Sequence, residues 1–512
     1  MGRRLLAALL AVSTLAVLLG AAPIARERAR RIGPEGIWVE VPEIAALGGG
    51  ALADDRQPGR PIIEIELKSG RVRDADLTIL RTWSRTLRRL DLGGNPLTDA
   101  GLAQLAGLTG LEALSLSGTQ VTDAGLVHLT GLANLKDLVL KDTRVTDAGL
   151  THVAALQGLE FLVLRGTRVT DAGMAAVGRL TNLVELDVRD TGVTDAGLAP
   201  VGRLPRLVAL SLSAAVTDAG LAQLRGLRAL EELSLPGAAV TGRGLANLAG
   251  LGKLEVVNLR GAGITDAGVA GLRGFPTLTQ VVLRDTRITD RGLAHVGALA
   301  RLETLDLADT PTTDAGLAEL RPLAALETLD LTGTRVTDAG LAHLAALGRL
   351  KFLDLTGTAV TGDGVLHLRG LRALETLDLT RTRVTDAALA HLAGLAGLKE
   401  LYLGQTGITD AGMAHVARLT GLEEVYLAGT GVTDAGLARL GGLTRLEKID
   451  LGGTKVTDAG LAHLKRLPKL DKVNLQDSRV TQAGIDAFLR EAPSVRVTPE
   501  LKDARRRPTG QD

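Results

Sequence analysis

Histidines and carboxylates are the side chains of this chain that could do chemistry, because none of its 512 residues is a cysteine. The absence of cysteine excludes disulfides, thiolate metal ligands and cysteine nucleophiles. Neighbouring helices pack about 8–10 Å apart, whereas zinc needs its nitrogen ligands within about 2.1 Å. We therefore expect no metal site and no cofactor, and only helix-surface roles for the histidines. All eight follow the same turn of a repeated pattern by five residues: His128, His152, His295, His343, His367, His391, His415 and His463.

A second recurring position could bind a partner. If the residues at this position share one face of a row of adjacent strands, carboxylates on neighbouring strands repel each other by somewhat under ~1 kcal/mol in water. Tyrosine and phenylalanine are enriched where partners dock, and only 2% of this chain is aromatic. The fifth position of seven successive units reads Asp306, Asp330, Asp354, Asp378, Tyr402, Tyr426 and Asp450, and the third position adds Phe352, Glu400 and Glu424.

We expect these ten residues to bind a basic or polyhydroxylated partner, with the two tyrosines as apolar anchors. The alternative is that the carboxylates only keep an exposed sheet face soluble.

Charge and motifs restrict the remaining functions. Lys and Arg number 59 against 58 Asp and Glu, giving a net charge of +1, which offers no general attraction to nucleic acid. Nucleotide-binding, zinc-protease and serine-hydrolase motifs are missing, so we expect no enzyme. Lys141, Arg165 and Arg189 repeat at the seventh position, a theme continued by Arg260 and Arg284. This run predicts a basic half opposite the acidic one, or else scattered solvated charge.

The elements that must position these residues follow from a pattern that restarts every 24 residues, with one shortened unit, from Leu87 to Leu470. Each of its 17 units reads L-x-x-L-x-L and then, after a turn, V-T-D-A-G-L-x-x-L-x-x-L. Alternating leucines predict a short strand. Thr-Asp before an apolar i, i+3, i+6 series predicts a capped short helix. The strands should stack in parallel and, because helices are wider, line the inside of a curve.

This pattern resembles the leucine-rich-repeat superfamily, and in particular ribonuclease-inhibitor-like horseshoes. It is closest to the cysteine-containing subclass known from F-box substrate receptors, whose consensus also contains I/V-T-D-x-G-L. The resemblance implies an α/β leucine-rich-repeat solenoid, a right-handed βα superhelix with a parallel sheet on the concave face and short helices on the convex face. It also implies a buried ladder of polar side chains bonded to neighbouring turns. That position is Asn95 in the first unit and mostly Thr afterwards, as at Thr119 and Thr454.

The ends of the chain differ from the repeats. Arg3 and Arg4 precede an apolar stretch from Leu5 to Leu19 and then small residues, which predicts a cleaved signal peptide or an uncleaved anchor at residues 5–22. We expect residues 1–25 to be this segment, 26–61 an irregular approach, 62–86 a cap repeat, 87–494 the seventeen repeats, 495–499 an edge strand and 500–512 a disordered tail.

Together these features predict an exported or membrane-anchored scaffold that binds a protein through its concave face and has no catalytic role. A polysaccharide partner is less favoured, a nucleic-acid partner is not expected, and the membrane is reached only through the N-terminal segment. Two alternatives stay open: an F-box-receptor-like adaptor for ubiquitin-ligase substrates, and a structural spacer of the cell envelope.

Overall fold

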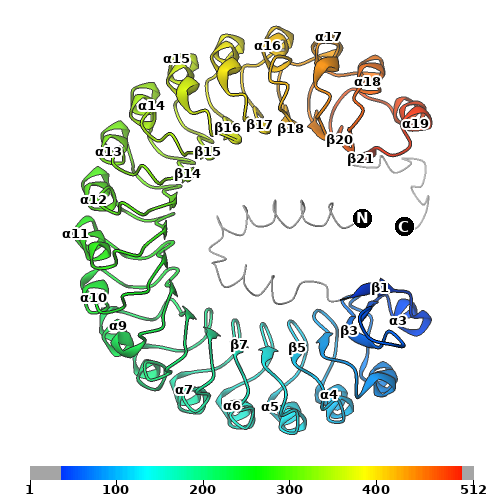
Figure 1. Ribbon diagram of the computed structural model, residues 1–512, viewed down its shortest axis with the longest axis vertical. Helices are drawn as coiled ribbons and strands as arrows, with labels where there is room; N and C mark the ends of the chain where they lie inside the picture. Colours follow the sequence, from blue (N-terminus) through cyan, green and yellow to red (C-terminus); the bar gives the residue numbers. More distant parts are fainter. Residues whose placement is uncertain (1–35, 499–512) are drawn as a thin grey trace, which may run out of the picture. The chain divides into compact units, whose positions relative to one another are not determined.

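The computed structural model describes residues 36–498. The expected signal or anchor segment and the expected tail of residues 500–512 lie outside this range. Within residues 36–498 the chain divides into two compact units, residues 36–282 (unit 1) and residues 283–498 (unit 2). In each unit, short parallel strands lie along the inner side and short helices along the outer side (Figure 1).

Nearly every strand is three residues long and pairs in parallel with its sequence neighbours. Those of unit 1 are β3 (Ile62–Glu66), β4 (Arg89–Asp91), β5 (Ala113–Ser115), β6 (Asp137–Val139), β7 (Phe161–Val163), β8 (Glu185–Asp187), β9 (Ala209–Ser211), β10 (Glu232–Ser234), β11 (Val256–Asn258) and β12 (Gln280–Val282). Those of unit 2 are β13 (Thr304–Asp306), β14 (Thr328–Asp330), β15 (Phe352–Asp354), β16 (Thr376–Asp378), β17 (Glu400–Tyr402), β18 (Glu424–Tyr426), β19 (Lys448–Asp450), β20 (Lys472–Asn474) and β21 (Arg496–Thr498).

The helices between the strands are short, and several are 3-10 helices, labelled η. Unit 1 has η1 (Asp74–Trp83), α4 (Asp99–Leu105), α5 (Asp123–Leu126), η2 (Val127–Leu129), α6 (Asp147–Val153), α7 (Asp171–Val177), η3 (Asp195–Gly197), α8 (Leu198–Val201), α9 (Asp218–Leu221), η4 (Ala222–Gly226), α10 (Arg243–Ala246), α11 (Asp266–Val269) and η5 (Ala270–Gly274). Unit 2 has α12 (Asp290–Val296), α13 (Asp314–Glu319), α14 (Asp338–Leu344), α15 (Gly362–Val365), η6 (Leu366–Gly370), η7 (Asp386–Gly394), α16 (Asp410–Val416), α17 (Asp434–Leu437), η8 (Leu440–Gly442), α18 (Asp458–Leu464) and α19 (Gln482–Glu491). No helix within residues 36–498 is long and apolar enough to cross a bilayer.

The core is the stack of leucines that the alternation predicted. In the first full repeat, Leu90, Leu92, Leu102 and Leu105 are all buried. Burying one such side chain stabilises the fold by about 1.5–3 kcal/mol, and each repeat covers the apolar face of the next. The strand and helix assignments made from the repeat are therefore confirmed.

The turn motif T-D-A-G links each repeat to the one before it. Thr146 caps α6, since its hydroxyl accepts a hydrogen bond from the Ala148 N–H. Asp123 of the preceding repeat accepts from the Thr146 N–H at 2.7 Å and from the Thr146 hydroxyl at 2.6 Å. The cap is thus the threonine, and the aspartate joins two repeats instead of serving its own helix.

We name these contacts the aspartate–threonine ladder. It runs through unit 1 from Asp74–Thr98 to Asp218–Thr241, and through unit 2 from Asp290–Thr313 to Asp458–Thr481 with an interruption at Gly362. The ladder also explains the glycine of the motif. A Cβ on Gly149 would lie 2.4 Å from an Asp123 carboxylate oxygen.

The buried polar position departs from expectation. The Thr119 hydroxyl donates to the Leu116 carbonyl of its own repeat at 2.7 Å, and later threonines such as Thr334 and Thr454 do the same. The longer Asn95 does reach the preceding turn, where its side chain accepts from the Val72 N–H and donates to a carbonyl of β3's repeat, and the Ser213 hydroxyl donates to the Val193 carbonyl of the preceding repeat at 2.5 Å. The expectation that threonine bonds neighbouring turns is wrong, because its hydroxyl is satisfied within its own turn.

The N-terminal segment is more regular than its sequence suggested. Within residues 26–61, expected to be irregular, β1 (Ile37–Val39), α3 (Pro42–Ala46) and β2 (Gly50–Ala53) are formed. β1 pairs antiparallel with β2, and β2 antiparallel with β3. Gly49 allows this packing, because a Cβ there would lie 2.4 Å from the Glu66 carbonyl oxygen.

Candidate functional site

The inner face of unit 2 holds the ten candidate residues in two rows. At the last position of each strand, Asp306, Asp330, Asp354, Asp378, Tyr402, Tyr426 and Asp450 are paired in register from β13 to β19. Two residues earlier, and therefore on the same face, lie Phe352, Glu400 and Glu424. Strands are about 4.8 Å apart, so this surface is long. The tyrosines and the two glutamates are immediate neighbours, whereas Phe352 lies two strands from Glu400.

The first four aspartates, which we name the acidic row, are Asp306, Asp330, Asp354 and Asp378. One carboxylate oxygen of each accepts a hydrogen bond from the backbone N–H two residues later, as in Asp354 with Thr356 at 2.8 Å and Asp378 with Thr380 at 2.7 Å. Asn474 makes the same contact with Gln476. This strand position therefore has a structural task, which is to terminate the strand and stabilise its turn.

The acidic row is more buried than its sequence suggested. Asp306 and Asp330 are 1% and 3% exposed, so the expectation that these carboxylates project into water is wrong for this end of the row. Burial, followed by the neighbouring Asp354 carboxylate, raises the pKa of Asp330. Burial and the Asp378 carboxylate raise the pKa of Asp354 in the same way.

Basic side chains neutralise the ends of this surface and not its middle. Arg284 lies 3.5 Å from Asp330 between nitrogen and oxygen, and Lys448 lies 2.5 Å from Glu424. Within residues 36–498, Asp354, Asp378 and Glu400 make no such ion pair. Burial and the adjacent Glu424 raise the pKa of Glu400. Negative charge therefore accumulates beside Tyr402.

Tyr402 and Tyr426 form a rigid aromatic pair. Their rings are stacked with centroids 4.2 Å apart and planes inclined by 4°. Each hydroxyl donates to the glutamate two residues earlier, Tyr402 to Glu400 at 3.1 Å and Tyr426 to Glu424 at 2.5 Å. Burial raises the pKa of both phenols above the usual value of 10, and the nearby carboxylates raise it further. The pair is thus held in one geometry and stays protonated at neutral pH.

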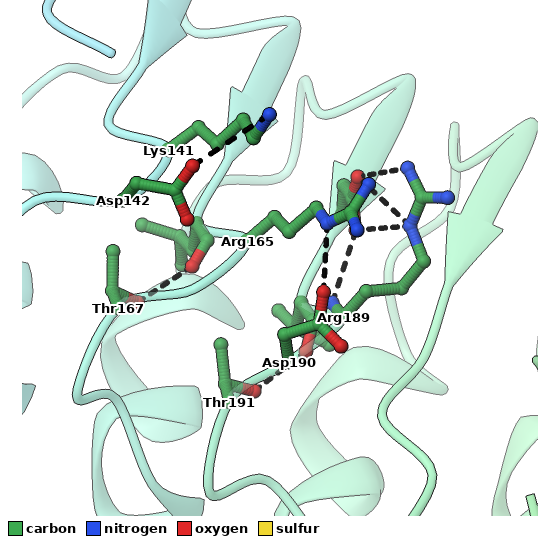
Figure 2. Close-up of polar contacts among 10 residues, drawn as sticks. Lys141, Asp142, Arg165, Thr167, Arg189, Asp190 and Thr191 are labelled. Carbon is green, nitrogen blue, oxygen red and sulfur yellow. Dashed lines mark hydrogen bonds and ion pairs between the residues drawn. The ribbon is translucent and has the colours of Figure 1, made fainter. Parts of the chain in front are cut away.

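The basic run in unit 1 is compensated. Figure 2 shows Lys141 and Arg165 beside acidic neighbours: Lys141 lies 3.6 Å from Asp142, and Arg165 lies 2.7 Å from Asp190. Arg189 lies 2.6 Å from Asp187. The predicted basic half is therefore wrong, and the alternative of scattered, solvated charge fits the structure. The sequence hid these pairs because Asp142 and Asp190 occupy left-handed turn positions, both with φ of 55°.

The histidines lie on or beside the outer helices, as expected. His343 of α14, for example, is half-buried and contacts the guanidinium of Arg321. In the part of the chain that the structure describes, no three His, Asp or Glu side chains come close enough to hold a metal ion.

The hydrogen bonds between each tyrosine and its glutamate were not predicted from the sequence. The signal was present in Glu400-Leu401-Tyr402 and Glu424-Val425-Tyr426, because residues two apart on a strand share a face. Lys448, which pairs with Glu424, lies 24 residues later at the same repeat position.

Comparisons with known proteins agree with this architecture. A family model described as leucine-rich repeat matches residues 84–106, 179–202 and 325–345. No curated protein sequence matches the chain. Among solved structures, the chain is similar to the mouse RP105/MD-1 complex, with a TM-score of 0.54 and 17% identity over 80% of this chain and 74% of that one.

A second similar structure is a leucine-rich-repeat protein of Leptospira interrogans, with a TM-score of 0.50 and 18% identity over 83% of this chain and 99% of that one. A third is TLR13 in complex with single-stranded RNA, with a TM-score of 0.50 and 17% identity over 78% and 64% of the two chains. At these identities the likeness concerns the fold.

Proposed function

Because this chain belongs to the leucine-rich-repeat superfamily, we propose that it is a non-catalytic scaffold that binds a protein partner through the inner strand face of unit 2. Repeats of this kind build extended concave surfaces that serve for binding. The proposed contact surface comprises Phe352, Asp354, Asp378, Glu400, Tyr402, Glu424, Tyr426 and Asp450, whereas Asp306 and Asp330, which the sequence also suggested, are too deeply buried to contact a partner.

The stacked pair of Tyr402 and Tyr426 is the observation that carries this proposal. They are the only two tyrosines of the chain, and they stand half-exposed on adjacent strands. Tyrosine supplies a large contact area at a small loss of side-chain entropy, and binding energy concentrates on such residues. Because the pair is already fixed by Glu400 and Glu424, docking a partner on it costs little further ordering.

The surrounding charge favours a protein partner with basic groups. Asp354, Asp378 and Glu400 would repel phosphates, so the same surface disfavours nucleic acid. Carboxylates beside an aromatic pair match lysine or arginine side chains and desolvate them against the rings.

We further propose that the scaffold works after export, because two arginines precede an apolar stretch within residues 1–22, the pattern of an export signal. N-terminal sequencing of the mature protein tests this part. A first residue between about 20 and 25 is expected, by the usual length of a signal peptide, and retention of Met1 on a protein that is not membrane-bound contradicts it.

Affinity capture tests the proposed surface. The full chain is immobilised beside a Tyr402→Ala/Tyr426→Ala variant and a control variant, His367→Ala/Glu319→Ala, whose changes lie on the outer helices of the same unit. We expect partners retained by the wild type and the control to be lost from the tyrosine variant. Equal retention by all three chains contradicts the proposal, provided that circular dichroism shows all three to be folded.

A further inference from the structure

We infer that the centre of this surface recognises arginine side chains, with the free face of Tyr402 as the platform and Asp378 and Glu400 as the carboxylate partners. The inference rests on the proposed function and names the chemistry of the partner. An arginine-bearing segment of another protein is the occupant.

Tyr402 offers only one face to a ligand. Its other face is covered by Tyr426 on β18, at 4.2 Å between ring centroids. The free face is turned toward β16, where the residue in register is Asp378. An aspartate side chain is shorter than a tyrosine, so the carboxylate lies at the base of the ring and leaves the outer part of that face uncovered. Tyr402 is accordingly half-exposed.

Carboxylate groups surround this free face on two sides. Asp378 lies at its base, and Glu400 lies on the same strand as Tyr402, where it holds the ring through the hydroxyl at 3.1 Å. Within residues 36–498 neither carboxylate has a basic partner, although Lys448 reaches the neighbouring Glu424. A cation that enters here meets two carboxylates that make no ion pair within residues 36–498, although the charge of Lys448 acts on Glu400 from the neighbouring strands.

The geometry favours arginine over lysine. A guanidinium is planar, stacks on an aromatic face and at the same time donates hydrogen bonds in its own plane. Stacked on Tyr402, it can donate to Asp378 and Glu400 together. A lysine ammonium keeps its hydration more strongly and has no flat face, so it gains the charge attraction without the stacking.

The test uses two synthetic peptides that differ only in their basic residues, a glycine peptide with two arginines and the same peptide with two lysines. Binding to the full chain is followed by NMR of carbon-labelled tyrosine. Since the chain has two tyrosines, the spectrum reports on this site alone. We expect the arginine peptide to bind about tenfold more tightly than the lysine peptide.

Three variants separate the contributions. Tyr402→Leu, followed through the remaining tyrosine, should abolish the preference for arginine and leave weak, salt-sensitive binding of both peptides. Asp378→Asn should weaken both peptides, and it keeps the turn intact because Asn474 makes the same backbone contact at the equivalent position. Glu319→Gln, exposed at the end of α13 on the outer side, should change neither affinity.

Equal affinities for the two peptides, or unchanged arginine binding in both Tyr402→Leu and Asp378→Asn, would overturn the inference. A marked gain in arginine-peptide affinity on changing Arg505, Arg506 and Arg507 to Gln in the full chain would also overturn it, because the chain's own basic segment would then be the occupant. These outcomes leave the proposed function intact if partner capture still depends on the tyrosines. Conversely, if partner capture does not depend on the tyrosines, the proposed function is contradicted whatever the peptides show.

Discussion

The interruption of the aspartate–threonine ladder at Gly362 predicts an energetic coupling between two residues of adjacent repeats. In intact repeats, the glycine of T-D-A-G lies against an aspartate oxygen of the previous repeat, and a Cβ there would come within 2.1–2.7 Å of that oxygen. Residue 388 takes this position as alanine, which is permitted because the residue opposite it is Gly362, where even an added Cβ would lie 3.6 Å from the Ala388 methyl group. Gly362 and Ala388 are thus matched to each other.

Restoring the ladder therefore requires both residues to change. Gly362→Asp alone would force a carboxylate oxygen onto the Ala388 methyl group, at a cost of about 1–3 kcal/mol for overpacking. Ala388→Gly alone loses about 1 kcal/mol of helix propensity. Together they create two hydrogen bonds from Thr385 to the new carboxylate, worth about 1–3 kcal/mol in total. The relieved overpacking and the new hydrogen bonds add in the thermodynamic cycle, so we expect a favourable coupling energy of about 4 kcal/mol between the two changes.

Hydrogen exchange and urea unfolding measure this coupling. Relative to Ala388→Gly, the double variant should slow exchange of the Thr385 amide by about 30-fold, which corresponds to about 2 kcal/mol. Gly242→Asp is the matched control. Gly242 has φ of 109°, and a Cβ there would lie 1.9 Å from Gly268, so this change should destabilise unit 1. If the effects of Gly362→Asp and Ala388→Gly on the free energy of unfolding are additive within about 0.5 kcal/mol, the assigned role of the ladder is refuted.

Three further outcomes are expected. Burial and Asp378 raise the pKa of Asp354 above 3.8, so the ionised carboxylate destabilises the folded state at neutral pH. Asp354→Asn should therefore have a higher free energy of unfolding than the wild type at pH 7. Urea titrations should show this difference vanishing as the pH falls toward 3.8. Tyr402 and Tyr426, whose pKa values are raised by burial, should show no tyrosinate absorbance at pH 10 while folded, and half-ionisation there would contradict their packing. Asn95→Ala should cost about 3 kcal/mol of unit 1 stability by leaving buried backbone groups unbonded, whereas an effect below about 0.5 kcal/mol would exclude the bridging role of Asn95.

The sequence was sufficient for the repeats and their register. Each unit buries the same leucines, so a period of 24 residues fixes which residues stack, and Asp306, Asp330 and Asp354 are paired as the pattern requires. One strand and one helix per unit follow from local periodicity alone.

Contacts that depend on the neighbouring repeat could not be assigned from a single unit. Asp123 looked like part of its own helix cap, but its partner is Thr146 of the next repeat. The burial of Asp330 depends on how closely adjacent turns pack. The compensation of Arg165 by Asp190 depends on a left-handed turn that does not alter the hydrophobic pattern.

The N-terminal strands were missed for a different reason. β1 and β2 occur once, contain three and four residues, and have no repeat to reveal them. Short strands of this kind are stable only through pairing with β3, which is a tertiary effect.

Site-directed photocrosslinking tests the central claim most directly. A benzophenone side chain replaces Phe352 on the inner face, where both tyrosines stay in place, and in a second protein it replaces Ala342, which is exposed on α14 at the outer side. Each protein is irradiated in the presence of its captured partner. We predict covalent adducts from position 352 and none from position 342. Adducts from position 342 with none from position 352 would show that the inner face of unit 2 is not the binding surface.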